Sequence, residues 1–328
     1  IQKRQKELEL TIALTNYCNF SCVYCYQNKN EKLMTTEVAN MIIEKIDRIL
    51  NDNKFEGINI HYFGGEPLLN IPVLIYLDEN IKKITDKIGI VYKAFLTTNG
   101  SMLSKELLQK VKFSSIQLTF DGLEKTHDRL RVSDHFPFKE EIELIENIMN
   151  FSQAKVLLRT NICKENKDEI IALHKYIFEK FGNERIEINP NRTIKYHQDD
   201  SFEMLSVQEY AEVAYQIKLL WSEQKGKFEL PVPRSTPCKF PYGNAYAISP
   251  EGYCTFCSGS MDQEKKYFFD VDIENKKMFS VRKECKKCNI LPLCLGGCII
   301  QYNLRAGACT YEKYELKNIL ISYIKHIS

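Results

Sequence analysis

The chain lacks a hydrophobic run long enough to cross a bilayer, and it lacks an excess of charge of either sign. Its 328 residues include 45 Lys and Arg against 43 Asp and Glu. That balance gives no argument for a nucleic acid or an anionic membrane as a partner. The polar start, residues 1–7, has no apolar core of a signal peptide. We therefore expect a cytoplasmic globular protein that binds neither membrane nor nucleic acid.

Cysteine, by contrast, is abundant: the chain has 12. Without a secretion signal, so many cysteines indicate metal binding or redox chemistry rather than disulfides. Three lie at residues 18–25, eight lie between residues 238 and 309, and Cys163 stands alone between the groups. The two groups predict two separate metal-binding regions.

The first group has the spacing C-x3-C-x2-C, formed by Cys18, Cys22 and Cys25. Three thiolates are one short of the four protein ligands that a structural zinc or an electron-transfer cluster normally takes. On an iron–sulfur cluster, three ligands leave one iron open to bind a substrate or cosubstrate. The alternative is a zinc knuckle whose fourth ligand lies elsewhere.

Strand and helix patterns alternate along the N-terminal two-thirds of the chain. Six strands are predicted, at 8–14, 58–63, 92–96, 115–120, 156–161 and 185–188, with helices at 35–50, 71–88, 105–110, 139–150 and 168–181. This order is typical of a parallel sheet with right-handed crossovers. Six units are too few for a closed eight-stranded barrel. The expected fold class is α/β, an open, partial (β/α)6 TIM-like barrel.

Chemically informative residues follow the predicted strands. The cysteine group follows the first strand, Gly64-Gly65-Glu66-Pro67 the second and Asn99-Gly100 the third, and Asn189-Pro190 ends the sixth. Turn chemistry alone can explain each Gly, Asn or Pro. Their arrival at one edge of the sheet places the predicted active site at the carboxyl ends of the strands.

The cysteine spacing, with Tyr24 before the last cysteine, resembles the cluster loop of radical S-adenosylmethionine (SAM) enzymes. The resemblance implies a [4Fe–4S] cluster whose open iron binds SAM, and a 5′-deoxyadenosyl radical as its product. Gly64-Gly65-Glu66-Pro67 matches the family's GGE motif, which implies pairing of the Glu66 carboxylate with the SAM amino group. The same resemblance implies that the ribose and carboxylate of SAM are held by Asn99, Thr119, Arg159 and Asn161.

The second cysteine group is similar to the SPASM extension found on radical SAM enzymes that modify peptides and proteins. This resemblance implies two auxiliary iron–sulfur clusters. Cluster I would be held by Cys238, Cys257 and Cys298, and cluster II by Cys285, Cys288, Cys294 and Cys309. The alternative is a pair of zinc ribbons, because C-x2-C is also a zinc spacing. The predicted domains are a barrel at 1–195, a bridging helical segment at 196–233 and a SPASM domain at 234–328.

No catalytic acid or base is defined by the sequence, and three candidates remain. Cys254 is a core residue or the fourth ligand of cluster I; if 252–257 is a strand, Cys254 and Cys257 point to opposite faces. Cys163 is a buried thiol or a hydrogen-atom donor. His127, with Arg131, contacts substrate or SAM, or belongs to a network that caps the following helix.

The resemblance implies a maturase that modifies a ribosomally made precursor peptide, by a C–C or C–S cross-link. The alternatives are a sulfatase-type maturase that oxidises Ser or Cys to formylglycine, and a non-catalytic electron carrier. Ser258 stands where sulfatase maturases usually carry Asp, which disfavours formylglycine chemistry. The expected partners are the peptide, an electron donor such as flavodoxin or ferredoxin and, because a leader-binding module is not expected before the first strand, a separate leader-binding protein.

Overall fold

The structure is a computed structural model of the chain. It describes residues 6–52, 55–182, 185–195, 201–234, 238, 240, 244–255, 257–259, 266–271, 281–298 and 309–327.

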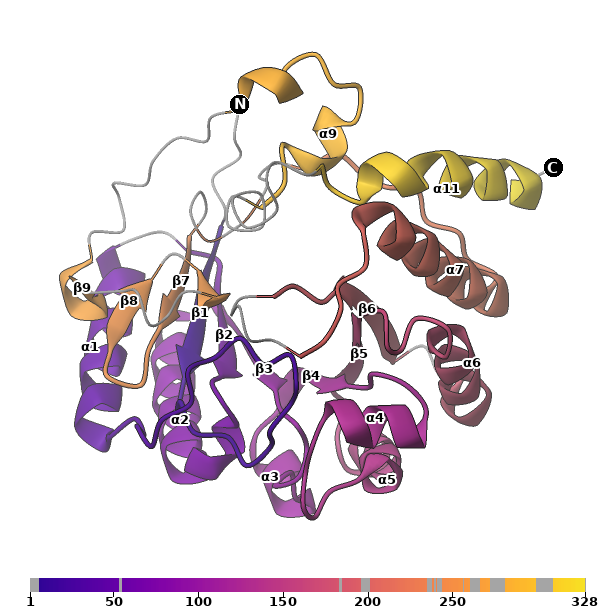
Figure 1. Ribbon diagram of the computed structural model, residues 1–328. Helices are drawn as coiled ribbons and strands as arrows, with labels where there is room; N and C mark the ends of the chain where they lie inside the picture. Colours follow the sequence, from indigo (N-terminus) through magenta and orange to yellow (C-terminus); the bar gives the residue numbers. More distant parts are fainter. Residues whose placement is uncertain are drawn as a thin grey trace.

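A curved parallel sheet forms the centre of the molecule (Figure 1). Its six parallel strands are β1 (Glu7–Ala13), β2 (Gly57–Phe63), β3 (Val91–Thr97), β4 (Phe113–Thr119), β5 (Lys155–Ile162) and β6 (Ile186–Arg192). Each strand pairs with the next in chain order. The predicted open six-unit barrel is therefore confirmed, and its carboxyl edge gathers the loops that follow the strands.

Helices cover the outer face of this sheet. They are α1 (Thr36–Asp52), α2 (Ile71–Ile88), α3 (Lys105–Lys110), α5 (Phe138–Phe151) and α6 (Ile170–Phe181). On β5, Val156, Leu158 and Ile162 are fully buried, whereas Leu157, Arg159 and Asn161 between them line cavities. This alternation places the hydrophobic core between sheet and helices and turns the intervening side chains toward the barrel interior.

Two details of this region differ from the prediction. Strand β6 was expected to end at Asn189-Pro190, but it runs through Pro190 to Arg192 and pairs with β5 along its length. Proline is tolerated there because β6 is an edge strand, so no neighbour needs its missing N–H. A short helix, α4 (Glu124–Leu130), was also not predicted.

The sheet continues on the other side of β1 with strands from the cysteine-rich third of the chain. Strand β7 (Ala245–Ile248) pairs parallel with β1, and the antiparallel strands β8 (Tyr253–Thr255) and β9 (Lys266–Tyr267) follow. This extension was not predicted. The division of the chain into three domains stays a prediction.

Helix α7 (Val207–Lys225) lies in the predicted bridging segment, and α11 (Glu312–Ile327) lies beside it (Figure 1). Lys218 Nζ lies 2.7 Å from Glu315 Oε1, and the hydroxyls of Tyr215 and Ser322 are 2.6 Å apart. The remaining short elements are η1 (Pro67–Asn70), η3 (Phe268–Asp270), η4 (Lys283–Cys285) and α9 (Leu291–Cys294).

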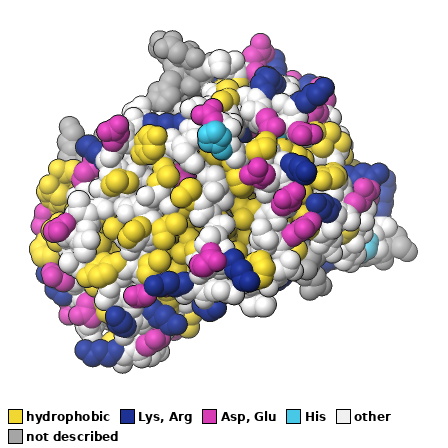
Figure 2. All heavy atoms as spheres, turned by 90° about the horizontal axis from the view of Figure 1, so that it is seen from below, with side chains coloured by type: hydrophobic (Ala, Val, Ile, Leu, Met, Phe, Trp, Pro, Cys, Tyr) yellow, Lys and Arg dark blue, Asp and Glu magenta, His cyan; other side chains and the backbone are white. Residues whose placement is uncertain are grey.

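The surface mixes charges of both signs. On the face shown in Figure 2, Lys and Arg side chains are interspersed with Asp and Glu among hydrophobic ones, and neither sign gathers into one field. None of the helices in the described part of the chain is both long and apolar enough to cross a membrane.

Candidate active site at the carboxyl edge of the barrel

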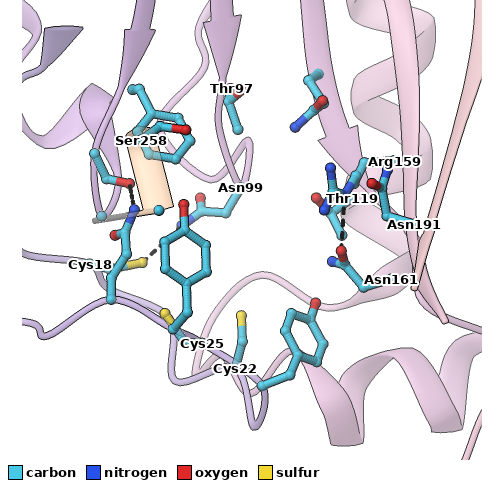
Figure 3. A pocket seen from close by; sticks show the side chains of 18 of the residues that line it. Cys18, Cys22, Cys25, Thr97, Asn99, Thr119, Arg159, Asn161, Asn191 and Ser258 are labelled. Carbon is cyan, nitrogen blue, oxygen red and sulfur yellow. Dashed lines mark hydrogen bonds between the residues drawn. The ribbon is translucent and has the colours of Figure 1, made fainter. Parts of the chain in front are cut away.

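The strand ends surround a cavity of about 490 Å³ (Figure 3). Both cysteine groups contribute to its wall. The lining residues are Cys18, Phe20, Cys22, Tyr24, Cys25, Tyr26, Gln27, Lys29, His61, Phe63, Gly64, Gly65, Thr97, Thr98, Asn99, Gln117, Thr119, Arg131, Arg159, Asn161, Asn191, Arg192, Thr193, Ile194, Cys257, Ser258, Gly259 and Cys298. The structure thus brings most of the predicted site residues into one space.

The three cysteines of the N-terminal loop lie along one side of this cavity (Figure 3). The Phe20 N–H donates a hydrogen bond to Cys18 Sγ at 3.4 Å, and Asn99 Nδ2 donates to the same sulfur at 3.9 Å. Burial raises the pKa of Cys22 to about 11. A metal cation would favour the thiolate and release that proton. The thiols therefore fit a metal cluster.

The three thiols of this loop match the ligand set of an iron–sulfur cluster with one open iron. The thiolates of a [4Fe–4S] cluster bind different irons, so they lie farther apart than the ligands of one ion. Three thiolates also leave one iron open.

The glycines after β2 allow that loop to pack on the backbone of the cysteine loop. Gly64 has a φ of 139°, and a β-carbon on it would stand 2.3 Å from the Thr15 carbonyl oxygen. The Gly65 N–H donates to that same oxygen at 2.9 Å. Only glycine combines this backbone conformation with so close an approach. Both glycines line the cavity.

Glu66 is fully buried, and it does not line the cavity. Its carboxylate accepts hydrogen bonds from the Thr98 hydroxyl at 2.7 Å, the Asn99 N–H at 2.7 Å and the Leu68 N–H at 3.0 Å. Burial raises the pKa of Glu66 to about 7, although these bonds oppose the shift. Glu66 therefore joins the end of β3 to η1, which begins at Pro67, itself a buried residue. Its predicted pairing with the SAM amino group stays a prediction.

The predicted residues at the ends of β4 and β5 lie on another side of the cavity (Figure 3). Thr119, Arg159 and Asn161 all line it. Arg159 Nε donates to Asn161 Oδ1 at 2.9 Å, and the Asn161 N–H donates to Asp121 Oδ1 at 2.6 Å. Burial lowers the pKa of Arg159, so a bound carboxylate would stabilise its charged form. This part of the wall can bind an anionic group.

Of the seven cysteines predicted to hold auxiliary clusters, Cys257 and Cys298 line the cavity. The Gly259 N–H donates to Cys257 Sγ at 3.3 Å. The others, Cys238, Cys285, Cys288, Cys294 and Cys309, do not line it, and none of the twelve cysteines forms a disulfide. One of the two predicted auxiliary clusters would therefore face the same space as the N-terminal cysteine loop.

The three candidate catalytic residues lie outside the cavity wall. Cys254, in β8, is 3% exposed and belongs to the main hydrophobic core. Strand β8 ends at Thr255, so the alternation argument does not extend to Cys257. Cys163 is fully buried against Leu130 and Phe202, and burial raises its pKa to about 12. His127 is 1% exposed.

Several lining residues were not predicted. Thr97, Gln117 and Asn191 point into the barrel from β3, β4 and β6. The sequence left open whether His61 or Tyr62 faces inward, and the structure places His61 on the cavity wall, with Nε2 2.7 Å from Thr97 Oγ1. His61 and Gln117 also line a second cavity of about 380 Å³. Polar residues at alternate positions within the strands were the available signal.

An open parallel barrel with three thiols at its carboxyl edge defines the class of this protein. The family model "Radical SAM superfamily" matches residues 12–177, half of the 328-residue chain. The chain therefore belongs to the radical SAM superfamily and is a radical SAM enzyme.

Two curated relatives cover different shares of the chain. The radical SAM cyclopropyl synthase TigE of Paramaledivibacter caminithermalis is 24% identical over 357 residues, covering 95% of this chain and 73% of TigE. The uncharacterised protein MJ0907 of Methanocaldococcus jannaschii is 34% identical over 119 residues, 35% of this chain. The match spans 39% of MJ0907's own length.

Solved structures share the fold over nearly the whole chain. The structure of anSMEcpe with bound AdoMet and Cp18Cys peptide has a TM-score of 0.77 at 18% identity, covering 98% of this chain and 100% of that one. Streptococcus suis SuiB bound to its precursor peptide SuiA has a TM-score of 0.63 at 17% identity, covering 90% and 72%. At these identities the likeness concerns the fold alone.

Proposed function

We propose that this protein is a radical SAM/SPASM maturase that cross-links a ribosomally made peptide through a C–C or C–S bond. The observation that carries the proposal is the shared cavity wall. Cys18, Cys22 and Cys25 contribute to it from the N-terminal loop, and Cys257 and Cys298 contribute from the C-terminal third. A peptide in this cavity would contact both the radical source and an auxiliary cluster.

The N-terminal cysteines would hold a [4Fe–4S] cluster with SAM. When bound, this pair supplies the radical that abstracts a hydrogen atom from an unactivated carbon. The chain's own task is to bind and orient SAM. Arg159 and Asn161 would hold its carboxylate and ribose together with Thr119 and Asn99, and the backbone at Gly64 and Gly65 would contact its amino end.

The C-terminal cysteines would hold two auxiliary clusters. Cluster I would be bound by Cys238, Cys257 and Cys298, and cluster II by Cys285, Cys288, Cys294 and Cys309. Hydrogen bonds at these sulfurs support the assignment, because donors to sulfur tune iron–sulfur clusters. Arg282 Nη2 donates to Cys285 Sγ at 3.7 Å, and the Gly296 N–H donates to Cys294 Sγ at 3.4 Å. These clusters would accept the electron that remains after bond formation.

Three similarities support a peptide substrate and a bond-forming reaction. TigE, similar over 95% of this chain, is a cyclopropyl synthase, and closing a cyclopropyl ring joins carbon atoms. The two similar structures contain bound peptides, Cp18Cys and SuiA. Ser258 lines the cavity next to Cys257; a hydroxyl there is a poorer base than a carboxylate, which disfavours formylglycine formation.

The test needs the precursor peptide, which is sought among short open reading frames beside the gene. The iron-reconstituted protein is incubated without oxygen with SAM, a flavodoxin reducing system and that peptide. We expect 5′-deoxyadenosine and a peptide lighter by two hydrogens that does not react with an aldehyde probe. Tandem mass spectrometry then locates the cross-link.

Each other outcome has a defined meaning. An aldehyde-reactive product would identify a formylglycine-forming maturase. No 5′-deoxyadenosine from fully iron-loaded protein would identify an electron carrier, and either result would refute the proposal. If the peptide reacts only after another gene product is added, that product is the separate leader-binding partner.

A further inference from the structure

A buried carboxylate lies behind the cysteine loop and has no part in the function proposed above. Glu141 is on α5, and its side chain is fully buried. Its Oε2 atom lies 3.1 Å from His127 Nε2 and 3.9 Å from Arg131 Nε. A buried charge is costly unless it is paired. The electrostatic effect of the Glu141 carboxylate therefore depends on these two neighbours.

His127 lies directly beside Glu141. The Asp121 N–H donates to His127 Nδ1 at 3.4 Å, so Nδ1 is the accepting nitrogen and Nε2 carries the ring hydrogen, although the contact of Nε2 with Glu141 is not a hydrogen bond. The rings of Phe120 and Phe138 pack on the imidazole, with centroids 5.6 Å and 5.3 Å away. His127 is thus a close neighbour of the carboxylate, and Arg131 is the cation beside it.

Arg131 in turn lies opposite Cys22. The Ser21 N–H donates to the Val132 carbonyl at 2.8 Å, and the Val23 N–H donates to the Leu130 carbonyl at 3.0 Å. These two backbone bonds flank both Cys22 and Arg131 and hold the two residues side by side. Arg131 also lines the cavity, with its guanidinium carbon 5.3 Å from the centre of the Phe20 ring.

We propose that Glu141 is a positioning residue that restrains Arg131 and offsets its charge, and thereby keeps the reduction potential of the N-terminal cluster low. Reduction adds one negative charge to a cluster. Arg131, opposite Cys22, stabilises that charge, and the buried Glu141 opposes it, because charges in a buried site are weakly screened. A low potential is useful because it makes the reduced cluster a stronger electron donor. The inference rests on the proposed assignment of Cys22 as a cluster ligand.

The experiment is a redox titration of the reconstituted protein, followed by the electron paramagnetic resonance signal that SAM perturbs. For Glu141→Gln at fixed ambient potential, we expect the ratio of reduced to oxidised cluster to rise about tenfold, which for one electron corresponds to about 59 mV. Arg131→Gln should lower that ratio. Glu140→Gln is the matched control, because it removes the same charge from an exposed position on α5.

The double variant Glu141→Gln/Arg131→Gln removes both charges together and should return the ratio to within about threefold of the wild type. If Glu141→Gln alone does not load iron, the comparison of the double variant with Arg131→Gln still isolates Glu141, and the double variant should show the higher ratio. An unchanged ratio in iron-loaded Glu141→Gln, or a shift in the same direction as Arg131→Gln, overturns the inference. Absence of any SAM-perturbed signal in the wild type would instead refute the proposed function.

Discussion

Gly65 lies against Tyr17 so closely that a β-carbon on Gly65 would stand 2.2 Å from the Tyr17 carbonyl oxygen. The neighbouring Glu66 N–H donates to that same oxygen at 2.9 Å. The glycine motif after β2 and the cysteine loop after β1 are therefore one backbone assembly. The shape of the cysteine loop depends on the absence of side chains at Gly64 and Gly65.

Gly65→Ala should therefore impair cluster loading. The added methyl group forces the two backbones apart, and overpacking of this kind costs about 1–3 kcal/mol. We expect a lower unfolding temperature and less iron bound per chain after reconstitution. Gly89→Ala is the control, because Gly89 has a positive φ of 73° but nothing within 4 Å of an added β-carbon. Equal iron loading in the Gly65 and Gly89 variants would contradict the backbone-assembly interpretation.

Glu66→Gln should destabilise the fold before SAM is present. All three donors to Glu66 come from the chain itself, and the amide nitrogen of Gln would face one of them with a second donor. An unsatisfied buried donor costs about 1–3 kcal/mol. Denaturant unfolding of the iron-free protein measures this loss directly. A SAM dissociation constant that rises while unfolding is unaltered would show that Glu66 serves SAM rather than the chain.

The pKa values of Glu66 and His174 predict two opposing effects of pH on stability. The folded pKa of Glu66 is raised by burial from 4.5 to about 7, so its contribution to stability falls as pH rises from 4.5 to 7. Burial lowers the pKa of His174 from 6.5 to about 3, so its contribution falls as pH drops from 6.5 to 3. Each slope is about 1.4 kcal/mol per pH unit, and between 4.5 and 6.5 the two slopes cancel.

Single variants should unmask each slope in the iron-free protein. Glu66→Gln leaves His174, so the free energy of unfolding should rise with pH from 4.5 to 6.5. His174→Gln leaves Glu66, so it should fall over the same range; Gln can still accept from Trp221 Nε1, which lies 3.0 Å from His174 Nδ1. Urea titrations at half-unit steps of pH measure the free energy of unfolding of each variant across this range. Parallel profiles for the two variants would refute the assignment.

The strand order and the main site residues could be predicted because their signals are local. Strands β1 to β5 have alternating or continuous apolar patterns, and Thr119, Arg159 and Asn161 stand at or near strand ends. Strand β7 could not be predicted, because all four of its residues are buried and a short apolar run gives no periodicity. Its pairing with β1 depends on contacts between residues more than two hundred positions apart.

The roles of buried polar residues were equally hidden. The motif predicted a SAM contact for Glu66 but not its three hydrogen bonds within the chain, and nothing in the sequence marked Glu141 as buried beside His127 and Arg131. The Arg131–Cys22 pairing likewise depends on two backbone bonds between distant loops. The spacing of the motifs identified which residues form the site. Their contacts with one another could be found only in the three-dimensional structure.

Changing Cys18, Cys22 and Cys25 together to Ala should remove one cluster and leave the C-terminal clusters in place. With three oxygen-labile clusters expected in the wild type, the variant should lose about one third of its iron and all SAM cleavage. Iron analysis and 5′-deoxyadenosine formation measure the two effects. Retained cleavage in this variant would refute the assignment of the SAM site.

The last prediction concerns the fourth ligand of auxiliary cluster I. Cys254 is buried in the core, on β8, whereas Cys257 follows the strand and lines the cavity. Cys254→Ala should therefore keep the full iron content, and the small void it leaves should cost about 1 kcal/mol of unfolding free energy. Cys257→Ala should lose the iron of cluster I.

Because Cys254 is then no ligand, one iron of that cluster would be open toward the cavity, where a substrate thiol could bind. Its spectrum should change when a thiol-containing peptide is added, and loss of iron in the Cys254 variant would instead make Cys254 the fourth ligand.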